Sequence, residues 1–194
     1  MEITTDLIKQ LRDITGVSVM QCKKALEESG GDIEKAQVVL RKASAAIALK
    51  KGDRTLGAGV AAAYVHAGGQ VVGAIVLGCE TDFVSKNEDF AKLAYDIAMH
   101  VAAMGPQFKT RDDVQESDIA AARSVFEAEA ASVSEAFRAK AVEGKLESYL
   151  SEKVLMNQPF VKDGSVTVGE LVSQAVQKFG EKVDVVRFER LSVQ

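Results

Sequence analysis

The chain has 194 residues, 47% hydrophobic and 27% charged, so it can bury a core of one or two small domains and is too apolar to be disordered. Its 24 Lys and Arg against 28 Asp and Glu give a formal net charge of −4, which argues against direct nucleic-acid binding over a broad surface. Only two cysteines occur, no signal-peptide pattern opens the chain, and no apolar run approaches the roughly 20 residues of a membrane span, so we expect a soluble, cytoplasmic protein with reduced thiols.

The first part of the chain predicts three short helices. Leu7, Leu11 and Ile14 recur at helical spacing and mark the first of them. A capping-box pattern that starts at Ser18 predicts the second helix, and Asp32 is a good N-cap for the third. These segments together predict a compact helical module.

The composition changes after residue 45. Apolar periodicity fades between residues 45 and 55, where charged residues and a glycine take over, which is typical of a linker. We therefore predict two parts: residues 1–55 form the three-helix module with its linker, and residues 56–194 form a core domain of a different fold.

The second part predicts a hairpin, then helices, then a last strand. Two runs rich in small or β-branched residues, 59–66 and 70–79, flank an Ala-Gly-Gly turn. Capping and periodicity then predict helices that begin at Ser85, Ser117, Ser134 and Thr167, followed by a closing strand over Val183–Val193. This order favours an α+β fold in which helices pack on a small antiparallel sheet.

A glycine pattern suggests a nucleotide cofactor, but its context does not. Residues 57–62 match a loose G-x-G-x-x-A motif. That fingerprint has to leave a strand and open a helix, whereas these residues leave a charged linker and enter a strand. We expect no cofactor and no metal site.

A thiol enzyme is a second alternative. Cys79 could act as a nucleophile with His66 or His100 as its base, since the three lie on elements that could pack together. Cys79 ends an apolar strand, however, and is more simply explained as a small core residue. We therefore expect no catalytic residue and no enzymatic activity.

One segment does not fit a purely structural role. Phe83 and Val84 come before the predicted helix, and Asp89 occupies the position where an apolar partner would staple an aromatic residue to that helix. Phe83 is therefore predicted to be an exposed aromatic wedge, of the kind that protein interfaces use as an anchor.

Two stretches, 11–26 and 80–86, closely resemble the two signatures of the bacterial elongation factor Ts family, and 158–163 and 167–171 resemble its later segments. The resemblance spans nearly the whole chain. The chain has room for one copy of a core that longer members duplicate, and no inserted coiled-coil hairpin is evident.

The resemblance implies a guanine-nucleotide exchange factor for elongation factor Tu. It implies that a module like a ubiquitin-associated domain docks on this GTPase, and that an Asp-Phe tip intrudes between the GTPase's helices and disturbs the region that holds Mg²⁺. The matching positions are Arg12, Val19 and Met20 in the N-terminal module, and Thr81, Asp82, Phe83 and Val84 at the tip.

Two questions stay open at this point. The N-terminal module could instead belong to an adaptor or peptide-binding protein without exchange activity. A sheet of about three strands also leaves unpaired edges, so two copies could pair about a two-fold axis and form a complex of two factors with two GTPases.

Overall fold

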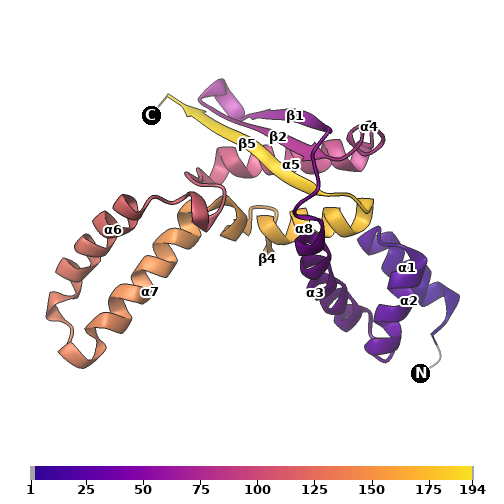
Figure 1. Cartoon of the computed structure of the whole chain (residues 1–194), viewed down its shortest axis with the longest axis horizontal. Helices are drawn as coiled ribbons and strands as arrows, with labels where there is room; N and C mark the ends of the chain where they lie inside the picture. Colours follow the sequence, from indigo (N-terminus) through magenta and orange to yellow (C-terminus); the bar gives the residue numbers. More distant parts are fainter. Residues whose placement is uncertain (1–2, 194) are drawn as a thin grey trace. The chain divides into compact units, whose positions relative to one another are not determined.

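The structure is a computed structural model that describes residues 3–193 (Figure 1). The chain divides into two compact units. The first unit holds the chain up to Ala62, Ile75–Asp96 and Glu170–Arg187. The second holds Ala63–Ala74, Ile97–Gly169 and the chain from Phe188 on. Both units therefore combine segments that are far apart in the sequence.

Three helices open the first unit, as predicted: α1 (Thr5–Thr15), α2 (Val19–Glu28) and α3 (Ile33–Lys51). Asp32 caps α3 by accepting a hydrogen bond from the Lys35 amide at 3.0 Å. The helices share a core of their own, made of Leu11, Val17, Cys22, Ala25, Leu26, Ala36 and Leu40.

The predicted linker is helical over most of its length. α3 continues to Lys51, although the apolar pattern fades from residue 45. The segment is rich in Ala, Leu and Lys, which favour helix even where packing does not demand it, and Ser44 is buried just before it.

The predicted hairpin is confirmed. Strands β1 (Ala58–Val65) and β2 (Val71–Cys79) are joined by the 3-10 turn η1 (Ala67–Gly69), and β5 (Val183–Ser192) completes a sheet of order β1-β2-β5. Gly68 and Gly69 both have positive φ, 80° and 70°, which glycine adopts without the strain that other residues would carry. The α+β fold class is confirmed as well.

Two further helices, α5 (Glu88–Met104) and α8 (Val168–Phe179), carry much of the apolar core. In the first unit the rings of Phe90 on α5 and Phe179 on α8 meet edge to face at 5.7 Å. In the second unit, Gly73 on β2 lies directly against the α5 backbone at Ala98, where a side chain on the glycine would clash.

The start of α5 differs from the prediction. The side chain of Asn87, not that of Ser85, accepts a hydrogen bond from the Asp89 amide, at 2.9 Å. The Ser85 hydroxyl is engaged in the preceding turn, where it donates to the carbonyl of Asp82 at 3.1 Å. Residues 82–85 form a separate one-turn helix, α4 (Asp82–Ser85).

The second unit contains a helical hairpin of α6 (Glu116–Glu129) and α7 (Glu135–Lys153), which lie side by side in Figure 1. The two helices correspond to those predicted to begin at Ser117 and Ser134. Every residue of α6 stays at least partly exposed. Ion pairs join the helices, including Arg123 with Glu143 at 3.0 Å and Lys145 with Glu129 at 2.6 Å.

The remaining elements of this unit are short. Strands β3 (Pro159–Phe160) and β4 (Asp163–Thr167) form a two-stranded antiparallel sheet that the sequence did not predict, since β3 is only two residues long. The other 3-10 turns are η2 (Arg111–Asp113), η3 (Ala130–Ser132) and η4 (Leu155–Asn157). Within residues 3–193, none of the helices has the length and apolar content that a membrane crossing requires.

A buried histidine organises the second unit. His100 on α5 is fully buried, and its Nε2 lies 2.8 Å from Oε1 of Gln158. The Val161 amide donates to Nδ1 at 3.2 Å, which places the ring proton on Nε2. Gln158 in turn donates to the carbonyl of Glu152 at 2.6 Å. Burial lowers the pKa of His100 below its ordinary value of 6.5.

This network predicts a pH dependence of stability. Because the folded-state pKa of His100 lies below the unfolded one, the unfolded chain binds more protons in this range. The free energy of unfolding should be highest above pH 6.5 and fall as the pH drops through 6.5 toward the folded-state value. Denaturant titrations of wild type between pH 5 and 8 measure this slope, which His100→Gln should flatten. His66→Gln, in the exposed hairpin, is the matched control; a wild-type slope in His100→Gln would contradict the prediction.

Candidate functional site

The residues predicted to contact a partner around position 82 lie together on one turn, Thr81–Val84, which we call the tip. Phe83 is 82% exposed, whereas the adjacent Val84 is 3% exposed and belongs to the core. The carboxylate of Asp82 pairs with Lys86 at 2.6 Å, but both side chains are largely exposed and such pairs contribute little stability. The tip thus presents a large aromatic ring and a carboxylate to solvent while Val84 anchors it.

The tip begins at the end of β2 and continues into α4. The thiol of Cys79 donates to the carbonyl of Thr81 at 3.2 Å, and the Lys86 amide donates to the carbonyl of Asp82 at 3.1 Å. α4 has only four residues, and a helix of one turn is unstable by itself because its nucleation costs more entropy than one hydrogen bond returns. The tip therefore depends on contacts from outside its own turn.

Those contacts come from the segment just before β5. The carboxylate of Glu181 accepts hydrogen bonds from the amides of Glu80 and Thr81 at 3.1 and 3.0 Å, and from the Thr81 hydroxyl at 2.6 Å. The carboxylate of Glu80 accepts a hydrogen bond from the Lys182 amide in return. Glu181 was not singled out from the sequence, because its partners are a hundred residues away and it has no local pattern.

Basic residues surround the Glu80 carboxylate. Arg54 donates to both of its oxygens, at 3.1 and 3.2 Å. The hydrogen bond from the Lys182 amide, and then the one from Arg54, hold the pKa of Glu80 below its ordinary value of 4.5. Glu80 is therefore ionised at neutral pH and joins the chain after α3 to the start of the tip.

The second group of predicted residues lies on the N-terminal helices. Arg12 is exposed near the end of α1, and Val19 and Met20 are the first residues of α2. Met20 is 82% exposed and Val19 is 49% exposed. The turn between the helices passes through Gly16, which has a φ of 67°. Two apolar side chains and one basic side chain are therefore exposed at the end of α1 and the start of α2.

A polar hollow in the first unit adjoins Arg12. It is lined by residues 12–16 together with Asp89, Lys92 and Lys178. Lys178 pairs with Asp89 at 2.8 Å, and its side chain lies against Gly16. Opposite charges line this hollow.

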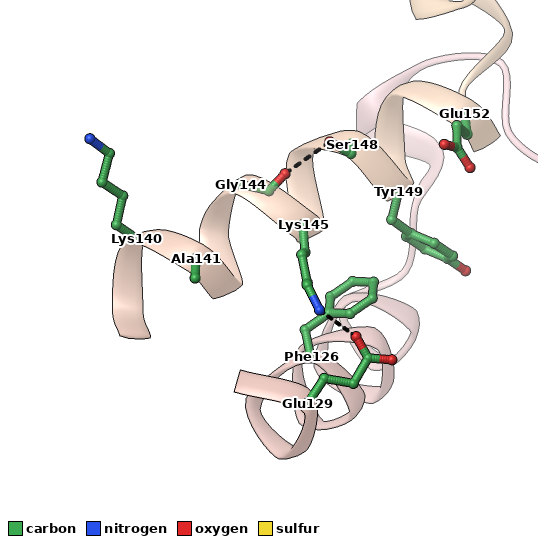
Figure 2. A pocket seen from close by; sticks show the side chains of 9 residues that line it. All are labelled: Phe126, Glu129, Lys140, Ala141, Gly144, Lys145, Ser148, Tyr149 and Glu152. Atoms are coloured by element: carbon green, nitrogen blue, oxygen red, sulfur yellow. Dashed lines mark hydrogen bonds and ion pairs between the residues drawn. The ribbon is translucent and has the colours of Figure 1, made fainter. Parts of the chain in front are cut away.

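A second hollow lies between α6 and α7 (Figure 2). Figure 2 shows the Lys145–Glu129 pair beside the ring of Phe126, which meets the ring of Tyr149 edge to face at 6.0 Å. Its remaining lining is Lys140, Ala141, Gly144, Ser148 and Glu152. This set combines small, aromatic and paired charged side chains and has no arrangement of nucleophile and base.

The thiol-enzyme alternative finds no support in the geometry. Cys79 is fully buried, and burial raises the pKa of its thiol, so the reactive thiolate is disfavoured. The His100 ring is occupied by Gln158 and Val161, and the His66 ring by the Tyr64 hydroxyl at 3.3 Å. Among residues 3–193 no cluster of three or more His, Cys, Asp or Glu side chains could hold a metal ion.

The glycines of the G-x-G-x-x-A pattern allow close packing against β2 and the residue that follows it. The Gly57 amide donates to the carbonyl of Cys79 at 3.1 Å, and a Cβ at Gly57 would come within 2.8 Å of the Glu80 carbonyl oxygen. A Cβ at Gly59 would come within 2.6 Å of the Leu77 carbonyl oxygen. The segment enters strand β1, as the sequence indicated, and its glycines permit close approach to β2.

Comparison with known proteins gives a match over nearly the whole chain. Residues 4–194 match the sequence model of the family described as Elongation factor TS. Elongation factor Ts of Desulforamulus reducens is 44% identical over 191 residues, covering 97% of this chain and 88% of that protein. Elongation factor Ts of Thermotoga neapolitana is 44% identical over 193 residues, covering 100% and 98%, and that of Solibacter usitatus is 42% identical over 194 residues, covering 99% and 92%.

Proposed function

Because the chain belongs to the elongation factor Ts family of translation elongation factors, whose known role is nucleotide exchange on elongation factor Tu, we propose that its tip and N-terminal helices carry out that exchange. The observation that carries the proposal is the 82% exposure of Phe83 on a turn whose neighbour Val84 is buried. We place the activity in the cytoplasm, where protein synthesis takes place, with elongation factor Tu as the partner and no direct contact with nucleic acid or membrane.

The proposed mechanism starts from the shape of the tip. Phe83 enters between helices of the GTPase, and because packed helices yield by shifting as units, a single wedge can displace a whole segment. The segment that holds Mg²⁺ moves with it. Loss of Mg²⁺ contacts removes the main neutralisation of the phosphate charges, and GDP then dissociates faster. Thr81 and Asp82 contact the partner beside Phe83, while Val84 keeps the turn in place.

The energy required is within the reach of a small contact surface. Acceleration of GDP release by about 1000-fold needs about 4 kcal/mol off the dissociation barrier. Full burial of a phenylalanine side chain supplies about 1.5–3 kcal/mol, and the N-terminal helices supply further binding energy. No covalent bond is made or broken, so the protein acts as a binding partner and not as an enzyme. The coupling is reciprocal: a factor that weakens GDP binding is itself released more readily by GDP.

The N-terminal helices have the complementary role of docking. Arg12, Val19 and Met20 form the surface that holds the GTPase while the tip acts. We assign docking to residues 1–55 and the exchange step to residues 56–194. The separate core of the three helices supports this division, since the docking surface can keep its shape without the tip.

We also propose that two copies associate and bind two GTPases. β1 is an edge strand of the sheet, and its sequence, residues 58–65, has no charged residue and no proline. Natural edge strands usually carry such residues to prevent pairing with another chain. An unprotected edge of eight residues can pair with its copy about a two-fold axis.

Phe83→Ala should slow catalysed GDP release by about tenfold or more while leaving stability within about 0.5 kcal/mol, because Phe83 lies outside the core. Stopped-flow release of a fluorescent GDP measures the rate. Phe137→Ala on α7 is the matched control, since Phe137 is also exposed, at 65%. Wild-type exchange by Phe83→Ala would refute the wedge.

Met20→Asp should weaken binding to nucleotide-free elongation factor Tu by about tenfold or more. The substitution replaces an apolar side chain that the complex would bury by a carboxylate that loses its hydration there. Titration calorimetry with the full chain measures the affinity. Val125→Asp, on α6 and 55% exposed, makes the same change elsewhere and should bind like wild type. Equal affinities for Met20→Asp and wild type would place the docking surface elsewhere.

Light scattering at micromolar concentration tests the association of two copies. We expect about twice the chain mass of 20.7 kDa for the free protein, and a two-to-two complex after addition of elongation factor Tu. Introduction of a lysine into the edge strand, as in Ala61→Lys, should shift the particle to the single-chain mass. A single-chain mass for wild type with and without the GTPase would rule out the dimer.

A further inference from the structure

The tip is held at its first residue by a carboxylate from the far end of the chain. Glu181 accepts three hydrogen bonds from Glu80 and Thr81, at 2.6–3.1 Å. Hydrogen bonds to an ionised acceptor are shorter and about twice as strong as those between neutral groups. One side chain thus fixes two consecutive backbone amides and one hydroxyl at the junction of β2 and α4.

The segment that carries Glu181 is itself fixed. Gly180 ends α8 with a φ of 72°, and its carbonyl accepts a hydrogen bond from the Lys51 ammonium group at 2.6 Å. On the other side, the Lys182 amide donates to the Glu80 carboxylate. Residues 80 and 81 therefore exchange hydrogen bonds with residues 181 and 182 in both directions.

The hydrogen bond from Thr81 to Glu181 takes the place of an ordinary helix cap. Thr81 is the N-cap residue of α4, where a threonine side chain ordinarily accepts a hydrogen bond from the helix backbone. Here the hydroxyl donates to Glu181 instead. α4 therefore has no side-chain cap from Thr81, and the Thr81 hydroxyl is bound to Glu181 instead.

Order in the tip has an energetic consequence for a binding partner. Fixing the backbone of a mobile residue costs conformational entropy, and a mobile tip would incur this cost when it binds. Val84 anchors the end of the tip in the core, and Glu181 anchors its beginning, so Phe83 lies between two fixed points.

We propose that Glu181 is a positioning residue for nucleotide exchange: through its hydrogen bonds to Glu80 and Thr81 it holds the tip in the conformation in which Phe83 enters the GTPase. The inference rests on the proposed function. Glu181 acts through the tip, and its removal loosens the tip without removing any side chain of the tip or of the docking surface.

The first test measures GDP release as a function of factor concentration. Glu181→Ala should lower the maximal rate by about tenfold and change the half-saturating concentration little, because docking through Arg12, Val19 and Met20 is intact. Glu181→Gln should keep most of the rate, since its amide oxygen can accept from the two backbone amides and its NH₂ can donate to the Thr81 hydroxyl. Glu127→Ala, an exposed carboxylate on α6, removes the same charge and should behave like wild type.

The second test separates positioning from a general structural role. In a Phe83→Ala background, Glu181→Ala should have little further effect on the rate, because the residue acts through Phe83. An equal further loss in that background would overturn the proposal. If Phe83→Ala alone exchanges like wild type, the proposed function fails; if Phe83→Ala is slow but Glu181→Ala is normal, only the positioning role fails.

Amide hydrogen exchange gives a readout that does not depend on activity. The amides of Glu80 and Thr81 should exchange faster in Glu181→Ala than in wild type, while amides in α2 and α3 stay protected. If Glu181→Ala does not fold, Glu181→Asp can be used, because it keeps the charge on a side chain that is shorter by one methylene. It should also lower the maximal rate of GDP release and speed amide exchange at residues 80 and 81. Unchanged protection at residues 80 and 81 in a folded variant would overturn the proposal.

Discussion

The exchange of hydrogen bonds between residues 80–81 and 181–182 is the constraint on which the tip depends. A one-turn helix cannot order itself, so α4 takes its conformation from Glu181 at one end and from the buried Val84 at the other. The same contacts hold the backbone on both sides of Phe83, whose side chain is 82% exposed. A wedge requires an exposed ring on a backbone that neighbouring segments hold in place, because a mobile tip would lose conformational entropy on entering its partner.

Burial separates the side chains that pack the cores from those that stay on the surface. The N-terminal helices close their own core around Leu11 and Leu26, and this leaves Met20 free on the surface. In the second unit the polar core residue His100 has hydrogen-bond partners in Gln158 and Val161 and contributes to stability instead of chemistry. The groups that would be needed for a thiol reaction are thus all engaged in structure. This distribution agrees with a protein that acts by binding and by displacing a segment of its partner.

Local features of the fold could be predicted from the sequence, and long-range ones could not. The cap at Asp32, the glycine hairpin after β1 and the exposure of Phe83 each follow from neighbouring residues. The start of α5 was misplaced because both Ser85 and Asn87 can cap a helix, and the choice depends on a turn that exists only when α4 is anchored. Glu181 carries no local pattern, since its partners are a hundred residues away.

The central claim is that Phe83 becomes buried in elongation factor Tu, and the chain offers a direct measurement because it contains no tryptophan. In Phe83→Trp, labelled with 5-fluorotryptophan, the single fluorine signal should report an exposed ring in the free protein. On addition of unlabelled, nucleotide-free elongation factor Tu, the signal should shift and lose its dependence on the H₂O/D₂O ratio of the solvent. A complex that forms with normal affinity while the fluorine signal keeps its solvent-exposed position would contradict the account.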